Sequence, residues 1–466
     1  MMPARFEDKP IAADPWAPYV PDEKSPWDLR RVVHLHRRAG FAATWAEIQR
    51  DLKDGPRTSI DRLLAGRAYR DVVPTDFARA ADILGGAAGG SNEPMRLRAW
   101  WVYRMMFGPD PLGERLVLMW HNHFATSNLK VDDLVAMRRQ NEVFRKHARA
   151  PFGELLDAVL RDPAMLIWLD APANRKGHPN ENLGRELMEL FTLGIGNYTE
   201  TDVKEAARAL TGWSIEDDAF AEVDSAHDPG EKTILGKKGR WKATDLIRIL
   251  VEHPATARRL AYRIGQLLLG EKAMRSTDID ALAAGLRRRN LDIGWAVETV
   301  LRSRLFFADE NIGNRVLAPV EYVLGAARAL ELFEPPANTF ILAEWVTRLG
   351  QELFYPPNVG GWPGGRAWLT SRSLIARANF AVTIVSGQRG GLAEPLDALG
   401  LARRHGQGGD RESVIRFFSR VLLGREPSPA WCQRLMAALG ADARDESEIA
   451  RRIVSRILAM PEFQLG

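Results

Sequence analysis

Apolar residues recur three and four positions apart through most of this chain. That spacing places them on one face of a helix, so the pattern predicts helices rather than strands. The predicted helices cover residues 27–39, 45–52, 60–65, 75–84, 95–107, 112–123, 140–147, 151–162, 182–193, 202–210, 244–252, 256–269, 279–289, 293–303, 319–332 and 340–349, with about three more in residues 412–463. We therefore expect a mainly α fold, a large multi-helix orthogonal bundle with a small C-terminal helical unit.

Local capping and turn signals sharpen several boundaries. Thr44 with Glu47, and Thr199 with Asp202, have the spacing of a capping box, in which two groups satisfy the first helical turn. The sequence GGAAGGSN at residues 85–92 is typical of a helix breaker. The clearest non-helical insert covers residues 214–242, where HDPGEKTILGKKGRW predicts a short β-hairpin.

These elements divide the chain into consecutive parts. They are an extended proline-rich arm at residues 1–26, a helical core at 27–213, the hairpin insert at 214–242, a second helical half at 243–387, a linker at 388–411 and C-terminal helices at 412–466. A chain of 466 residues exceeds the usual size of one domain. Both one large helical body with appendages and a two-domain protein fit this length.

Composition narrows the class of protein. The 64 basic and 60 acidic residues nearly cancel, leaving a net charge of +4, and no Lys/Arg block predicts nucleic-acid binding. Cys432 is the single cysteine, which excludes an intramolecular disulfide and a cysteine-rich zinc site. No apolar run reaches the length of a membrane span, and no signal peptide is visible. We expect a soluble protein, cytoplasmic as written, and periplasmic or secreted if a leader is missing.

The predicted helix at residues 112–123 is apolar nearly all round and ends in two histidines, His121 and His123. In a continuous helix the two rings point about 200° apart and cannot bind one metal ion. If the helix ended at Trp120 and the backbone extended, both would project to one side, as in HxH metal sites. The alternatives are two hydrogen-bonded core histidines, metal ligands, or acid–base catalysis by His123.

A second candidate element is the helix at residues 182–193, whose polar face carries Glu186 and Glu189. Carboxylates on one helical face are usually solvated surface groups. Leu193 lies in the same polar stripe, however, so this face could pack against protein. Facing a histidine, the carboxylates would suit zinc, manganese or iron; without a metal, they would suit general acid–base work.

Two loops carry further candidate residues. His227 and Asp228 open the sequence HDPGEK and are either a ligand pair or part of an Asp-Pro-Gly turn. The loop at residues 356–369 carries Trp362, Arg366 and Trp368, which would stack on sugar rings if exposed, or staple helices if buried. Trp213 is grouped with them as a candidate substrate-binding residue, because many of the 14 tryptophans flank these motifs.

The motifs of several common enzymes are missing. The chain has no GxxxxGK[ST] sequence and no GxGxxG after a predicted strand, so a nucleotide site has little support. It also has no GxSxG nucleophile elbow, which argues against a serine hydrolase of that type.

Five ordered sequence blocks carry a family resemblance. They are RRAGFAATWAEI, MWHNHFATS, NENLGRELMELFTLGIGNYTETDVKEAARALTGW, HDPGEKTILG and PPNVGGWPGGRAWLTSRSLIARANF, followed by PEFQ near the C-terminus. From about residue 27 to residue 463 the chain resembles the bacterial domain-of-unknown-function 1800 family. The resemblance implies a protein that is often exported and often encoded beside a partner resembling sulfatases and alkaline phosphatases. This sequence departs from the exported pattern, because no leader is visible.

Three functional hypotheses follow. The first is a hydrolase or lyase, metal-dependent or not, acting on a polysaccharide or other envelope polymer through a buried His/Glu site. The second is a non-catalytic binding or maturation partner of a phosphatase- or sulfatase-like protein, and the third is a metal-dependent oxidoreductase. The candidate residues are Glu186, Glu189, His123 and Asp228 for catalysis; His121, His123, Glu186 and His227 for a metal; and Trp213, Trp362, Arg366 and Trp368 for substrate.

Overall fold

Helices account for nearly all regular structure in the computed structural model, which describes residues 14–69, 73–271, 273–387, 394–439 and 445–466. The fold is mainly α, as the apolar spacing predicted. The first helices are α1 (Leu29–Ala39), α2 (Trp45–Leu64), α3 (Phe77–Gly89), α4 (Pro94–Phe107), α5 (Pro111–His123), α6 (Asn128–Val131), α7 (Leu134–Lys146), α8 (Phe152–Leu160), α9 (Pro163–Trp168), α10 (Asn182–Glu186) and α11 (Glu200–Ala209). A π-helix, η3 (Leu187–Thr192), continues α10.

The second part of the chain follows two small antiparallel sheets, so the predicted insert holds two hairpins. They pair β1 (Trp213–Glu216) with β2 (Ala219–Glu222), and β3 (Lys232–Ile234) with β4 (Lys237–Gly239). The helices that follow are α12 (Ala243–Glu252), α13 (Pro254–Leu268), α14 (Ser276–Arg288), α15 (Ile293–Arg302), α16 (Pro319–Ala329), α17 (Thr339–Arg348), α18 (Ser371–Thr383), α19 (Ala398–Arg404), α20 (Arg411–Leu423), α21 (Pro429–Ala437) and α22 (Glu446–Ala459). Short 3-10 turns are η2 (Ala171–Ala173), η4 (Asp224–Ala226), η5 (Asp309–Asn311), η6 (Gly365–Trp368) and η8 (Pro461–Gln464).

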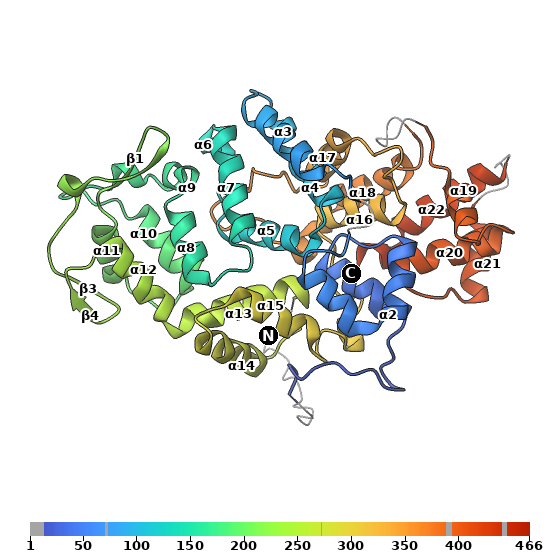
Figure 1. Ribbon diagram of the computed structural model, residues 1–466, viewed down its shortest axis with the longest axis horizontal. Coiled ribbons are helices and arrows are strands. Elements are labelled where there is room, and N and C mark those ends of the chain that lie inside the picture. The colour runs from blue at the N-terminus through green and yellow to red at the C-terminus, as the bar shows by residue number, and fades with distance from the viewer. Residues whose placement is uncertain (1–13, 70–72, 272, 388–393, 440–444) are drawn as a thin grey trace.

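The molecule is elongated, with the hairpins at one end and α19–α22 at the other (Figure 1). Helix α5 crosses the middle, between these two ends. Buried apolar residues form one continuous cluster from Leu35 to Phe463, which includes residues of the C-terminal helices. Among the described helices, none has both the length and the apolar character needed to cross a membrane. The division into separate domains stays a prediction.

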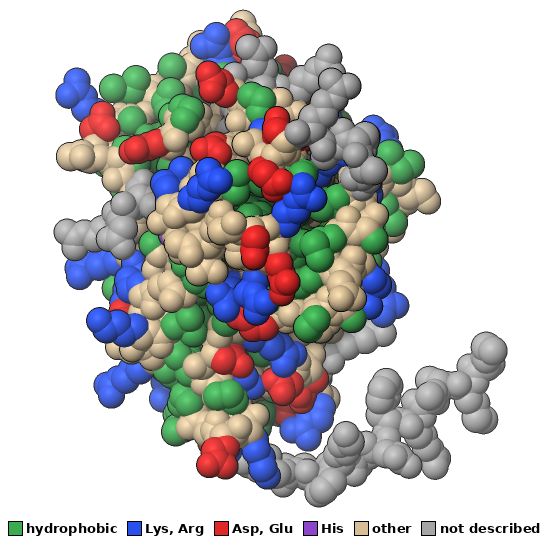
Figure 2. Space-filling model, turned by 90° about the vertical axis from the view of Figure 1, so that its right-hand side faces the viewer, with side chains coloured by type: hydrophobic (Ala, Val, Ile, Leu, Met, Phe, Trp, Pro, Cys, Tyr) green, Lys and Arg blue, Asp and Glu red, His purple; other side chains and the backbone are tan. Residues whose placement is uncertain are grey.

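The termini and surface add two details. The described part of the N-terminal arm is extended against the body: the Trp16 indole donates to the Asp278 carbonyl (3.0 Å), and Tyr19 N–H donates to the Arg302 carbonyl (2.7 Å). Residues 1–13 of the predicted arm, and 388–393 of the predicted linker, lie outside the described residues. On the face turned toward the viewer in Figure 2, acidic and basic side chains are interspersed.

The predicted helix breaker at residues 85–92 is wrong, because α3 continues to Gly89. Gly85 allows α3 to pack closely against α4, because a Cβ at this position would lie 2.7 Å from Nε1 of Trp100 on α4. The same indole donates to the Ala81 carbonyl at 2.8 Å. The first glycine of this run is therefore a contact point between α3 and α4 rather than the end of a helix.

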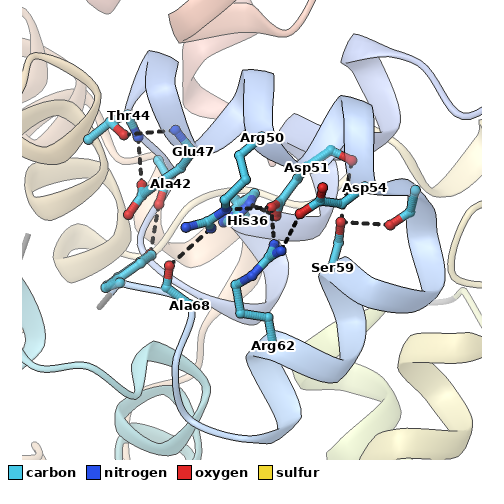
Figure 3. A network of polar contacts seen from close by, with 12 residues as sticks. His36, Ala42, Thr44, Glu47, Arg50, Asp51, Asp54, Ser59, Arg62 and Ala68 are labelled. Atoms are coloured by element: carbon cyan, nitrogen blue, oxygen red, sulfur yellow. Dashed lines mark hydrogen bonds and ion pairs between the residues drawn. The ribbon is translucent and has the colours of Figure 1, made fainter. Parts of the chain in front are cut away.

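The N-terminal helices are joined by a buried polar network (Figure 3). The capping box of Thr44 and Glu47 at the start of α2 is confirmed, as is that of Thr199 and Asp202 at α11. Asp51 accepts a hydrogen bond from Nε2 of His36 (2.8 Å), and both side chains are buried. Burial would raise the pKa of Asp51, but the bond from His36 and the nearby guanidinium of Arg50 lower it to about 2.

Candidate functional site

Helix α5 carries both candidate histidines in regular helical geometry. It begins after Asp110, whose carboxylate accepts the Gly113 N–H (2.8 Å), and it continues to His123. The Phe124 N–H still donates to the Trp120 carbonyl at 2.8 Å. The alternative in which the helix ends at Trp120 is therefore wrong, because the backbone remains helical past that residue. The two imidazoles consequently point to different sides of α5.

His121 is held by the loop that follows α17. Its Nε2 accepts the Phe354 N–H at 3.3 Å, so the ring proton is on Nδ1. The ring packs among Trp101, Phe144, Phe354 and Trp362. Burial lowers the pKa of His121 to about 3, which leaves the imidazole neutral near pH 7. His121 thus fixes a loop to α5.

His123 is held by the opposite segment. Its Nε2 lies 3.0 Å from the Phe191 carbonyl, which can only accept, so this ring is protonated on Nε2. Its Nδ1 is buried and has no hydrogen-bond partner among the described residues. Burial lowers the pKa of His123, and the charges of Arg263 and Arg259 lower it further. The two histidines adopt opposite tautomers because they join α5 to different parts of the chain.

The carboxylate block meets His123 through its backbone. Near the end of the π-helix η3, the Phe191 carbonyl accepts from His123, and the Leu190 carbonyl accepts from Nε of Arg259 (2.7 Å). The Glu189 carboxylate instead accepts the Tyr198 hydroxyl. Burial raises the pKa of Glu186, and neighbouring Glu189 raises it further. No hydrogen bond or ion pair of the described residues joins Glu186 or Glu189 to a histidine.

His227 and Asp228 build a turn far from α5. The ring Nδ1 of His227 donates to the Thr211 carbonyl at 3.0 Å. Asp228 accepts from Nε of Arg208 (2.7 Å) and from the Gly230 N–H (2.8 Å). The Arg208 hydrogen bond lowers the pKa of Asp228 to about 2. The turn lies between β2 and β3, and these hairpins are at one end of the molecule, whereas α5 is in its middle (Figure 1).

The predicted metal ligands do not converge in the described structure. His121, His123 and His227 each bond to a different segment, and Glu186 makes no hydrogen bond to any of them in the described structure. Within residues 14–69, 73–271, 273–387, 394–439 and 445–466, no three His, Cys, Asp or Glu side chains form a group that could hold a metal ion. Trp213 is also buried, with Arg161 stacked 5.1 Å from its ring centre.

The loop at residues 356–369 is clamped onto α5 by Asn122. The Asn122 side chain accepts the Trp362 N–H (2.7 Å) and donates to the Trp362 carbonyl (3.3 Å). Gly361 precedes this clamp with a φ of +77°, and a Cβ there would lie 2.2 Å from Oδ1 of Asn122. Trp362 and Trp368 are only 6% and 8% exposed, whereas Arg366 is exposed. Two motif blocks predicted separately therefore meet in space.

We expect Asn122→Ala to destabilise the protein by about 1–3 kcal/mol, because it leaves the buried Trp362 N–H and carbonyl without partners. Urea unfolding followed by circular dichroism measures the change. Asn92→Ala, at an exposed position between α3 and α4, is the control and should leave the free energy of unfolding unchanged. Equal stability of the two variants would contradict the clamp.

This junction borders a cavity of about 150 Å³. The cavity is lined by side chains of α5, α13, α16 and the 356–369 loop, and by residues just after α13, before α16 and after α17. The polar and aromatic lining residues are Arg115, Asn122, Arg263, Glu271, Arg315, Glu321, Gln351, Trp362 and Trp368. Gly365, with a φ of +51°, brings the loop against Glu271, since a Cβ there would lie 1.8 Å from Oε1. The cavity therefore joins two of the predicted substrate-binding residues to charged residues that sequence reading missed.

The electrostatics of this cavity are dominated by Arg115, Arg315 and Glu321. Nη1 of Arg115 contacts Oε1 of Glu321, and Nη2 of Arg315 lies 2.5 Å from the same oxygen. Burial would raise the pKa of Glu321, but the charges of Arg115 and Arg315 outweigh it and lower the pKa to about 2. Arg115 was the missed signal: it is a cation directly before the apolar run at residues 116–120 of α5, on a helix that is buried nearly all round.

Comparison with known proteins gives the family of the chain. The family model described as "Protein of unknown function (DUF1800)" matches residues 34–465. The chain belongs to the DUF1800 family. For this DUF1800 protein, neither the curated proteins nor the solved structures contain a match. The cavity and its lining residues therefore carry the functional argument.

Proposed function

We propose that the protein is a hydrolase or lyase that acts on a polysaccharide or another envelope polymer, and that the cavity beside α5 is its site. The observation that carries this proposal is Glu271, a cavity-lining carboxylate that is exposed and makes no hydrogen bond or ion pair with the described residues. A carboxylate with free lone pairs beside an open cavity is available to accept a proton from a substrate.

Glu321, the other carboxylate of the cavity, has a different role. With its pKa near 2 and two guanidiniums on it, Glu321 stays ionised and cannot donate a proton near neutral pH. Glu321 therefore cannot be the general acid of a two-carboxylate hydrolase, whereas a lyase needs only one base, the role that the unpartnered Glu271 can fill. In that reaction Glu271 takes the proton from the ring carbon that bears the carboxyl group of a uronate. The electron pair of that C–H bond forms a C=C bond to the adjacent ring carbon as the C–O bond from that carbon to the leaving sugar breaks, and the proton passes to the departing oxygen.

The tryptophans and the amide groups supply contacts for a sugar. Trp362 and Trp368 are largely buried, so they form walls of the cavity rather than an exposed platform. An indole wall packs against the apolar face of a sugar ring. Asn122 is already engaged by the loop, whereas Gln351 uses its Oε1 for the Val320 N–H (3.1 Å) and retains its amide N–H groups for a ligand.

We expect Glu271→Gln to lower the rate of polymer cleavage by about 10²–10⁴-fold, the contribution of a general base. The assay follows the ultraviolet absorbance of new C=C bonds, and reducing ends, in purified protein incubated with neutral and uronate-containing polysaccharides. Glu216→Gln, at an exposed position of β1 far from the cavity, is the matched control and should keep full activity. Full activity of Glu271→Gln, or no cleavage of any polymer by the natural sequence, would overturn the proposal.

The binding or maturation partner is the second candidate function. It is favoured by the separate, buried positions of His121 and His123, and by exposed apolar side chains on α17 and α18, namely Phe340, Leu374, Ile375 and Val382. It predicts that a co-expressed phosphatase-like enzyme gains activity only with this protein present, and that Ile375→Asp abolishes the gain. The oxidoreductase alternative gains no support from the described His, Asp and Glu residues, which form no ligand cluster.

A further inference from the structure

We infer that the arginine-lined wall of the cavity binds an oxyanion, which is a carboxylate, sulfate or phosphate group of the ligand. This inference rests on the proposed function where it makes the polymer acidic. The anion site itself can be measured without any reaction.

The first observation is an excess of buried positive charge. The cavity is lined by Arg115, Arg263 and Arg315, and Glu321 is the carboxylate that pairs with two of them. Arg38, which is fully buried, adds a further cation that interacts electrostatically with Arg115 and Arg315. The lining therefore sets three guanidiniums against two carboxylates, Glu321 and the exposed Glu271, and Arg38 behind it adds to the positive side, so an incoming anion would offset the remaining positive charge.

The second observation is a set of hydrogen-bond donors without acceptors. Arg115 is 2% exposed, and its Nε and Nη2 have no partner in the described structure. The Nε atoms of Arg315 and Arg263 are also buried and unpartnered. Buried donors are normally satisfied, because an unmade hydrogen bond is costly. Guanidinium groups bind carboxylate, sulfate or phosphate oxygens through paired N–H donors. The terminal nitrogens of Arg263, which also make no hydrogen bond with a described residue, offer such a pair to the cavity, whereas the buried Nε and Nη2 atoms reach a ligand only if their side chains move.

The third observation concerns Arg263, which makes no hydrogen bond or ion pair with any described residue. It lies on α13 and lines the cavity, while Arg259 one turn away donates to the Leu190 carbonyl. Burial lowers the pKa of Arg263 to about 10, and the charge of Arg259 lowers it further. A cation held in this way contributes little to the fold, which makes it the residue to change.

Thermal unfolding of the full chain tests the anion site. Sodium sulfate, sodium phosphate and sodium D-glucuronate are each compared with sodium chloride at equal ionic strength. We expect a saturable rise in Tm with at least one oxyanion and none with chloride. Tighter binding of glucuronate identifies a carboxylate subsite, and tighter binding of sulfate or phosphate identifies an ester subsite.

Two variants make the test specific. Arg263→Met keeps the side-chain bulk and should fold with an unchanged or higher Tm without anion, while its oxyanion affinity falls about tenfold or more. Arg263→Gln is the second variant should Met disturb packing. Arg258→Met removes the same charge from the exposed face of α13, where Arg258 pairs with Asp280, and should keep the full anion response.

The outcomes separate this inference from the proposed function. Suppose that the natural sequence shows an anion response, that Arg263→Met loses it, and that the protein cleaves no polymer. This result supports the anion site and overturns the proposed hydrolase or lyase activity. No response beyond that of chloride, or a full response in both Arg263 variants, overturns the anion site whatever the protein cleaves.

Discussion

Replacing Glu321 with Gln is expected to lower the free energy of unfolding by about 3–5 kcal/mol, the usual cost of removing one partner from a buried ion pair. Glu321 neutralises Arg115 and Arg315, and its other oxygen accepts the Ala318 N–H at 2.8 Å to cap α16. Without its charge, two guanidiniums lie in the core with no counterion. Urea unfolding at neutral pH measures the loss.

Two comparisons make this result diagnostic. Glu93→Gln removes one partner of the exposed Arg96–Glu93 pair and should change the free energy of unfolding far less, because solvent screens an exposed ion pair. Sulfate should stabilise Glu321→Gln more than it stabilises the natural sequence, because the anion replaces the missing carboxylate. Equal costs for the two Glu variants would contradict the buried charge cluster.

Acidification is expected to weaken the fold through three buried histidines. Burial lowers the pKa of His34, His121 and His123, so each stays neutral in the folded protein while it gains a proton on unfolding below its ordinary pKa. Their stability contribution is therefore complete above about pH 6.5 and is lost as the pH falls. Together they cost about 4 kcal/mol between about pH 7.5 and 5.5.

Asp162 acts in the opposite direction over the same range. Burial raises its pKa to about 7, so the folded form takes up a proton as the pH falls and recovers about 2 kcal/mol. The natural sequence should therefore lose about 2 kcal/mol and Asp162→Asn about 4 kcal/mol, measured by urea unfolding at the two pH values. His121→Gln should lose about 1.4 kcal/mol less than its parent, while exposed His178→Gln should match its parent. A pH-independent stability would contradict neutral buried histidines.

Helices were predicted correctly from the sequence where they bury a single stripe of apolar residues and begin with a recognisable capping residue. Helix α5 was predicted within one residue of its observed start, and the capping boxes at α2 and α11 were predicted by residue. Helix α18 was missed, because Leu374, Ile375 and Val382 on its exposed side blur the apolar stripe. The end of α3 was missed because Gly85 serves a contact with Trp100, which is distant in sequence.

The candidate site was harder to predict, since its residues come from distant segments. Spacing within α5 predicted correctly that two histidines on a continuous helix diverge, but it could not show that His121 meets Phe354 and His123 meets Phe191. Arg115, Arg263 and Arg315 are spread over 200 positions, so no local motif links them. Trp362 and Trp368 were singled out as substrate-binding residues that would stack on sugars if exposed; both are buried, and their contact with a substrate stays a prediction.

If the arginine-lined cavity beside α5 is the functional site, it should take up an oxyanion from solution. Anomalous diffraction from crystals soaked in selenate locates such an anion directly. We expect a peak inside the cavity, within hydrogen-bond distance of Arg115 and of Arg263 or Arg315, that disappears in Arg263→Met crystals. Selenate found only on the outer surface, with the cavity empty at saturating concentration, would contradict this expectation.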